Sequence, residues 1–121
     1  MTEKQNSKQY DLEERTLEHA RKVRSFVKKI SKTISNIEDG KQVVRASGSM
    51  GANYIEANEA LSKKDFIVRI KICRKEAKED GYWLKLIDVG SDKNLEREQQ
   101  ELIKEATELM LIFGSILRKS E

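Results

Sequence analysis

The chain has 121 residues, of which 24 are Lys or Arg and 21 are Asp or Glu, so its net charge is only +3. This length fits a single domain over residues 1–121, and the net charge alone is too small to indicate a nucleic-acid-binding protein. One Cys and one His cannot build a disulfide framework or a typical zinc site, and the absence of proline suits long helices.

The N-terminus is polar and carries no apolar segment. Residues 1–9 are expected to be disordered. Nowhere does an apolar run approach the roughly 18 residues that a membrane-spanning helix needs. We therefore expect a cytoplasmic protein without a membrane partner, and nothing in the sequence predicts a cofactor or a metal site.

The first predicted helix covers residues 10–37. Its apolar residues recur at alternating steps of three and four, and they are Ala20, Val23, Val27, Ile30, Ile34 and Ile37. Asp39-Gly40 then indicates a turn, and the apolar spacing resumes at Val43. Such a short connection predicts a hairpin of two neighbouring helices.

The second predicted helix covers residues 41–60 and is rich in small residues, namely Ser47, Gly48, Ser49, Gly51 and Ala52. Each interior glycine disfavours a helix by about 1 kcal/mol relative to alanine. We therefore expect this helix to approach a second backbone closely, because packing must offset that cost. A phosphate-binding glycine loop does not fit, since such a loop follows a strand and begins a helix.

The third and fourth helices are bounded by capping and stop signals. Ser62 and Asp65 resemble a capping box, and the third helix runs from there to a stop at Gly90. The fourth helix begins near residue 93, and its broad apolar arc, with LMLIFGSIL at 109–117, predicts self-association. Short connections between long helices favour an all-α, antiparallel up-down-up-down four-helix bundle.

Residues 42–87 carry a recognisable signature. Its characteristic positions in this sequence are Arg45, Ser49, Asn53, Glu56, Phe66, Glu76 and Trp83. In these positions the sequence resembles the four-helix bundle proteins encoded in intervening sequences of bacterial 23S rRNA genes. It differs at Met50 and Tyr54, where that family often has Ile. The first and fourth helices match the family only in their apolar pattern.

The resemblance implies both an assembly and partners. It implies a bundle that forms a ring-like homopentamer, so the first expected partner is a second copy of the chain. Related proteins are accessory variability determinants of diversity-generating retroelements, and the resemblance to them implies a reverse transcriptase and nucleic acid as further partners. Most members of the family have no assigned activity.

Positive charge concentrates in two segments. Residues 1–38 carry nine basic and six acidic side chains, and residues 61–90 carry eight and five. Steps of three and four place two basic sets on helix faces, and these sets are Arg21, Arg24, Lys28 and Lys32, and Lys71, Arg74, Lys75 and Lys78. If both helices lie on one side of the assembly, repeated copies would strengthen their attraction for phosphates. The alternative is a solvated surface that Glu18, Glu76 and Glu79 partly neutralise.

No combination of residues predicts an enzyme. Glu56 has no nucleophile, His or metal partner placed to work with it. We interpret Asn53 and Glu56 as a buried polar network that fixes helix register, or as a subunit contact. His19 is predicted at the surface, and Cys73 is predicted to be a small core residue.

Two functions remain open from the sequence. The leading hypothesis is a non-catalytic oligomer that binds RNA or DNA through its basic faces, as an accessory to an enzyme such as a reverse transcriptase. The competing hypothesis is a structural or protein-interaction oligomer. Tyr82 and Trp83 could stack on bases, but Trp83 shares a face with Leu86 and Ile87, which favours packing.

Overall fold

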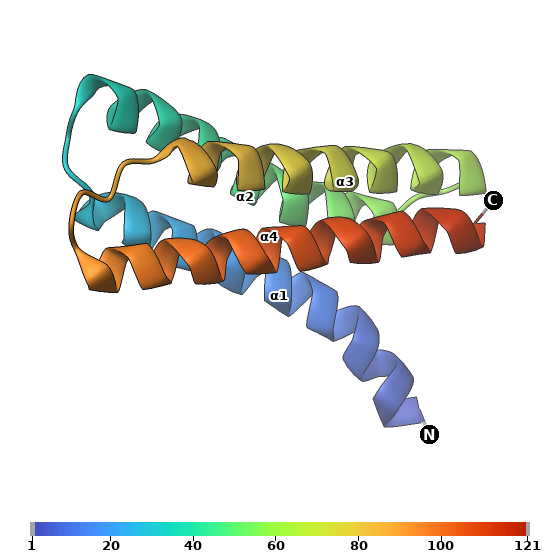
Figure 1. The fold of residues 1–121 in the computed structure, drawn as a ribbon. Coiled ribbons are helices and arrows are strands. Elements are labelled where there is room, and N and C mark those ends of the chain that lie inside the picture. The colour runs from blue at the N-terminus through green and yellow to red at the C-terminus, as the bar shows by residue number, and fades with distance from the viewer. Residues whose placement is uncertain (1, 121) are drawn as a thin grey trace.

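The computed structural model describes residues 2–120, with side chains from Leu12 onward. It consists of four α-helices, α1 (Thr2–Lys29), α2 (Ile34–Asn58), α3 (Lys63–Leu86) and α4 (Lys93–Ser120) (Figure 1). The described residues include no strand, which confirms the all-α class. The backbone of residues 2–9 belongs to α1, but their side chains lie outside the described part. The disorder expected for residues 1–9 is therefore not tested and stays a prediction.

The first connection lies earlier than the sequence predicts. α1 ends at Lys29 and α2 begins at Ile34, so the predicted helix over residues 10–37 is wrong at its C-terminal end. Thr33 marks the true start of α2, because its Oγ1 accepts a hydrogen bond from the amide of Asn36 at 3.1 Å. Such a cap satisfies one of the free amides of the first helical turn.

Gly40 and Gly51 of α2 face α1. A Cβ built on Gly40 would lie 3.1 Å from Cγ1 of Val27, and a Cβ on Gly51 would lie 3.0 Å from Oγ1 of Thr16. Both distances are shorter than ordinary contacts, and a Cβ on Gly51 would also lie 3.9 Å from the backbone carbonyl carbon of Thr16. The predicted close approach of a second backbone is therefore confirmed at Gly51, whereas Gly40 meets a side chain. Gly40 therefore serves helix packing inside α2, and the turn predicted at Asp39-Gly40 is wrong.

The later boundaries agree better with the sequence. Ser62 caps α3 as predicted, because its Oγ accepts a hydrogen bond from the amide of Asp65 at 3.1 Å. α3 ends at Leu86, before the predicted stop at Gly90, which lies in the connection with a φ of +66°. α4 begins at Lys93, as predicted.

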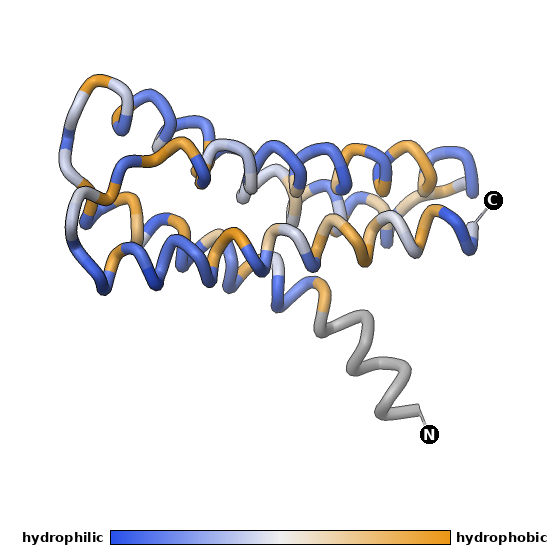
Figure 2. The backbone as a smooth tube through the Cα atoms, in the orientation of Figure 1, coloured by the Kyte–Doolittle hydropathy of each residue, from blue (hydrophilic) through white to orange (hydrophobic). Residues whose placement is uncertain are grey.

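Each helix packs against the next along the chain, and α1 also packs against α4 (Figure 1). Contacts between α1 and α4 follow opposite directions along the two helices. Arg15, early in α1, contacts Glu105, whereas Lys29, at the end of α1, contacts Glu98, which lies earlier in α4. Hydrophobic and hydrophilic residues alternate along α2, α3, α4 and the coloured part of α1 (Figure 2). None of the described helices is both long and apolar enough to span a membrane.

The core consists of two clusters of buried side chains. One surrounds Met50 and Phe113, and the other surrounds Phe26 and Leu84. Cys73 belongs to the first cluster and is fully buried, as predicted. Burial raises the pKa of the Cys73 thiol to about 12, because an apolar environment disfavours the thiolate.

The apolar arc of α4 is mostly satisfied inside the bundle. Met110, Ile112 and Ile116 are half-buried against the first core cluster. Leu111 is the exposed apolar residue of this run, with 61 % of its surface accessible. The arc therefore leaves little exposed apolar surface on α4. Self-association stays a prediction, and its remaining support is the family resemblance.

Candidate nucleic-acid interface

The eight basic residues predicted to bind nucleic acid all have exposed side chains. Three lie on α1 and four lie on α3. Lys32 lies in the connection between α1 and α2, because α1 ends at Lys29, so its predicted place on the first helix is wrong. The set comprises Arg21, Arg24, Lys28, Lys32, Lys71, Arg74, Lys75 and Lys78.

The two basic sets form separate faces of the chain. In the described part, the backbones of α1 and α3 do not approach each other, whereas α2 and α4 each pack against both. Nη2 of Arg24 lies 3.3 Å from the position of a Cβ on Gly48, so Arg24 leans toward α2. Cδ of Arg74 lies 3.9 Å from the position of a Cβ on Gly114, so Arg74 leans toward α4.

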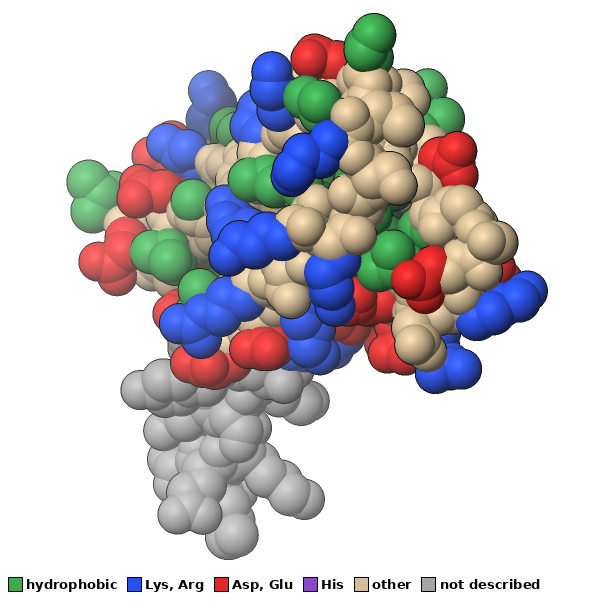
Figure 3. Space-filling view, turned by 90° about the vertical axis from the view of Figure 1, so that its left-hand side faces the viewer, with side chains coloured by type: hydrophobic (Ala, Val, Ile, Leu, Met, Phe, Trp, Pro, Cys, Tyr) green, Lys and Arg blue, Asp and Glu red, His purple; other side chains and the backbone are tan. Residues whose placement is uncertain are grey.

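These eight cations make no ion pair with another described residue, whereas Arg15, Lys29 and Arg45 do. Arg24 donates a hydrogen bond to the carbonyl of Ala20 at 3.0 Å. Lys and Arg side chains gather over the end of the bundle where α1 joins α2, with acidic side chains among them (Figure 3). The predicted faces are thus free to attract anions.

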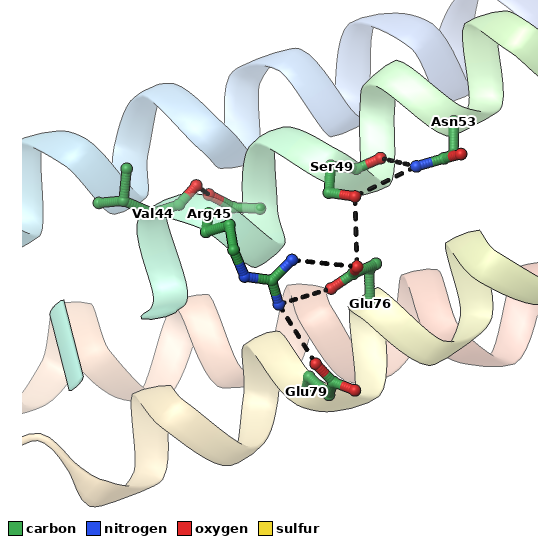
Figure 4. Close-up of polar contacts among 7 residues, drawn as sticks. Val44, Arg45, Ser49, Asn53, Glu76 and Glu79 are labelled. Atoms are coloured by element: carbon green, nitrogen blue, oxygen red, sulfur yellow. Dashed lines mark hydrogen bonds and ion pairs between the residues drawn. The ribbon is translucent and has the colours of Figure 1, made fainter. Parts of the chain in front are cut away.

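Arg45 on α2 holds two of the carboxylates of α3. Its guanidinium donates to Oε2 and Oε1 of Glu76 at 3.2 and 3.1 Å, and to Oε1 of Glu79 at 3.3 Å (Figure 4). The hydrogen bond with Glu76 raises the pKa of Arg45. Glu76 and Glu79 therefore pair with Arg45 and do not pair with the exposed basic residues of α3.

The contacts continue along α2 as a polar network. Oγ of Ser49 donates to Oε2 of Glu76 at 3.3 Å, and Nδ2 of Asn53 donates to the carbonyl and Oγ of Ser49 at 2.9 and 3.1 Å (Figure 4). Arg69 donates to Oδ1 of Asn53 at 2.9 Å. The network joins α2 to α3 through Asn53, and the register-fixing role of Asn53 stays a prediction. Glu56 is exposed and lies outside this network, so the register-fixing alternative is wrong for Glu56, and the subunit contact stays a prediction.

The aromatic residues of the signature divide between core and surface. Phe66 and Trp83 are half-buried, and each packs against one of the core clusters. This confirms the packing predicted for Trp83. Tyr82 is 57 % exposed, and its ring meets the Trp83 ring edge-to-face with 5.1 Å between centroids.

His19 is buried, so its predicted place at the surface is wrong. Nε2 of His19 lies 2.8 Å from Oδ2 of Asp80, and the two side chains are 1 % and 0 % exposed. Nδ1 of His19 and Oδ1 of Asp80 have no hydrogen-bond partner in the described part of the chain. Burial raises the pKa of Asp80, and the hydrogen bond with His19 lowers it in part.

A periodic signal could have located His19 correctly. Thr16, His19, Val23 and Phe26 are all buried, and they follow one another at steps of three and four. The apolar stripe predicted from Ala20 onward leaves His19 beside it and not within it. A polar residue at an inward position needs a polar partner, and Asp80 supplies it.

A groove of about 590 Å³ separates α1 from α4 and is lined in part by His19. Glu98, Glu101 and Glu105 lie along its α4 wall, so its charge does not favour phosphates. Among the described residues, no group of three or more His, Cys, Asp or Glu side chains is placed to hold a metal ion. The basic faces are therefore the candidate site.

Comparisons with known proteins agree with this architecture. The model of a family described as 23S rRNA-intervening sequence protein matches residues 8–115. The chain is also similar to a crystal structure of a protein with unknown function from the S23 ribosomal protein family of Bacteroides thetaiotaomicron VPI-5482. That similarity has a TM-score of 0.72 and 28 % sequence identity, and it covers 88 % of this chain and 97 % of that chain. No curated protein matches.

Proposed function

Because this chain belongs to the 23S rRNA-intervening sequence protein family, we propose that it is a non-catalytic protein that binds nucleic acid through its basic faces. In this proposal it is an antiparallel up-down-up-down bundle in the cytoplasm. It acts as an accessory to an RNA- or DNA-handling enzyme such as a reverse transcriptase. The names of the family and of the similar structure both refer to ribosomal components, which fits a nucleic-acid partner.

One observation carries the proposal. The exposed cations of α3 make no ion pair with described residues, while Glu76 and Glu79 of the same helix are held by Arg45. Cations that are not neutralised by neighbours can replace the counterions of phosphates, and the release of these counterions favours binding. A net charge of +3 thus understates the local positive potential.

Self-association would strengthen this binding. The family resemblance implies a ring-like homopentamer, and each subunit would present one α1 face and one α3 face. Several copies of a weak site on one particle raise the effective concentration of the next contact. We therefore expect the assembly to bind a long nucleic acid more tightly than a short one.

The test is fluorescence anisotropy with labelled structured RNA and duplex DNA, measured from low to physiological salt. Each phosphate contact on a duplex contributes about −0.9 to the slope of log K against log salt concentration. Changing Lys71, Arg74, Lys75 and Lys78 to Glu should abolish binding. The control changes Arg97, Lys104, Arg118 and Lys119 to Glu, which alters the net charge equally on exposed positions of α4.

The outcomes separate electrostatic binding from its absence. Loss of binding in the α3 variant and retention in the α4 control would support the proposal. Equal loss in both variants would show that only total charge matters. Absence of binding by the unaltered protein, even at low salt, would refute the proposal.

A specific observation supports the second candidate, a scaffold that binds protein. An apolar groove of about 390 Å³ runs between α1 and α2, where Leu17 and Ile55 are about half exposed beside Gly48 and Ala52. Contiguous apolar surface of this kind is typical of protein interfaces. Under this alternative the α3 variant retains its oligomeric state and its protein partner, and nucleic-acid binding is absent.

A further inference from the structure

One line of α3 combines lysines with an exposed aromatic ring. Its members follow at alternating steps of four and three, so they lie along one side of the helix. The line extends about 21 Å, at 1.5 Å per residue. We call it the α3 stripe, and it comprises Lys71, Lys75, Lys78, Tyr82 and Lys85, all of which are exposed.

No carboxylate competes for the α3 stripe from within its own helix segment. Between Lys71 and Lys85 the acidic residues are Glu76, Glu79 and Asp80. The first two are paired with Arg45 on α2, and Asp80 is fully buried against His19. The four lysines of the stripe make no ion pair with another described residue, so they remain available to phosphates.

Tyr82 lies at the surface, and its neighbour Trp83 packs against the core. More than half of its surface is accessible, whereas the adjacent Trp83 is half-buried against the second core cluster. The edge-to-face contact with Trp83, at 76° between ring planes, restricts the orientation of the Tyr82 ring. An oriented aromatic ring costs little conformational entropy when a second ring stacks on it.

Lysines and an exposed aromatic ring on one line match the chemistry of an unpaired strand. Lysines neutralise the phosphates, and an aromatic side chain stacks on a base whose π-face is free. Bases inside a duplex are stacked on one another and cannot reach such a ring. We propose that the α3 stripe binds unpaired nucleotides, with Tyr82 as the stacking platform for a base. This inference rests on the nucleic-acid binding proposed above.

The experiment compares labelled oligouridine, labelled oligothymidine and a labelled duplex of equal length by fluorescence anisotropy. Changing Tyr82 to Ala removes the ring, and changing Tyr82 to Leu keeps the apolar contact with Trp83 without an aromatic face. Changing Tyr82 to Trp preserves stacking. The control variant is Leu111→Ala, which removes another exposed apolar side chain, on α4. Circular dichroism confirms that each variant is folded.

The expected result is a loss confined to unpaired strands. Tyr82→Ala and Tyr82→Leu should weaken binding of both single strands by roughly 5- to 150-fold, with the salt slope unchanged because no cation is lost. Tyr82→Trp and Leu111→Ala should bind like the unaltered protein. Duplex binding should be the same for all four variants. RNA and DNA strands should respond alike, because stacking does not involve the sugar.

Failure of this inference differs from failure of the proposed function. If the charge-reversed α3 variant loses binding but Tyr82→Ala binds single strands normally, the stacking platform is refuted and nucleic-acid binding stands. If Tyr82→Ala weakens duplex and single strands equally, the preference for unpaired bases is refuted. If the unaltered protein binds none of the probes, both proposals are refuted.

Discussion

Separating the buried His19–Asp80 pair should cost more stability than replacing both side chains together. The two side chains are essentially inaccessible to water and meet at 2.8 Å. We consider His19→Leu, Asp80→Val and the double variant, because Leu and Val are apolar and close in size to the residues they replace. The two helices that carry the pair, α1 and α3, make no close backbone contact in the described part.

The magnitudes follow from burial. His19→Leu leaves the Asp80 carboxyl group without its partner, which should lower the free energy of unfolding by about 3 to 5 kcal/mol. Asp80→Val leaves a buried imidazole without a hydrogen-bond partner, so the free energy of unfolding should fall by about 1 to 3 kcal/mol. The double variant removes both groups and also removes the two unpartnered atoms. Its free energy of unfolding should equal that of the unaltered protein or exceed it by about 1 to 4 kcal/mol.

Urea denaturation measures the free energy of unfolding of the unaltered protein, the two single variants and the double variant. All four are compared at one fixed protein concentration, because the stability of an oligomer depends on concentration. Circular dichroism reports the helices, and Trp83 fluorescence reports the second core cluster. If the losses of the two single variants simply add in the double variant, the pair acts through shape and the reasoning from unpartnered polar groups is refuted. Single variants as stable as the unaltered protein would refute the burial of the pair.

Four further predictions test the fold. Gly51→Ala should lower the free energy of unfolding by about 1 to 3 kcal/mol, because the new methyl group meets a threonine of α1. Gly48→Ala should be neutral or stabilising by up to about 1 kcal/mol, since its methyl group meets only the flexible tip of an arginine. Urea denaturation of both variants measures the difference. Arg45→Ala should cost about 1 to 3 kcal/mol in the same assay, because a carboxylate with 6 % exposure loses its cation. Cys73 should resist alkylation at pH 8 until the chain unfolds, because its thiol pKa is about 12, and mass spectrometry with and without urea checks this. The pKa of Asp80 is raised in the folded state, so its contribution to stability is present below the unfolded pKa of about 3.9 and is lost as pH rises through the folded pKa. The urea midpoint of the unaltered protein should therefore fall as pH rises through this range. The midpoint of Asp80→Asn should lack this dependence.

The sequence predicts the number of helices well because each helix has an apolar stripe. It fails at the first connection for a physical reason. Ile34 and Ile37 continue the spacing of α1, yet Ile34 is 86 % exposed and Ile37 is 43 % exposed. Their periodicity therefore reflects no burial on α1. The polar cap at Thr33 was the informative signal, because a Ser or Thr before a helix satisfies free amides whatever the apolar pattern does.

The candidate site was predictable in part. Exposure of the eight basic residues follows from amphipathic spacing, and the structure agrees at each of them. The partner of each carboxylate depends on the register of α2 against α3, which spacing within one helix does not contain. Pairing of Arg45 with Glu76 and Glu79 therefore could not be derived, and neither could the separation of the α1 and α3 faces on non-neighbouring helices.

The division of charge on α3 links the stability of the bundle to its proposed function. The buried carboxyl group of Asp80 meets His19, and the carboxyl groups of the buried Glu76 and the more exposed Glu79 meet Arg45. These contacts fix α3 against α1 and α2. The same contacts remove negative charge from the neighbourhood of the outward lysines. α3 carries eight basic and four acidic residues, and because three of the four carboxyl groups are held by other helices, it presents one uncompensated cationic line. Local potential here results from which side chains are paired as well as from the excess of basic residues on α3.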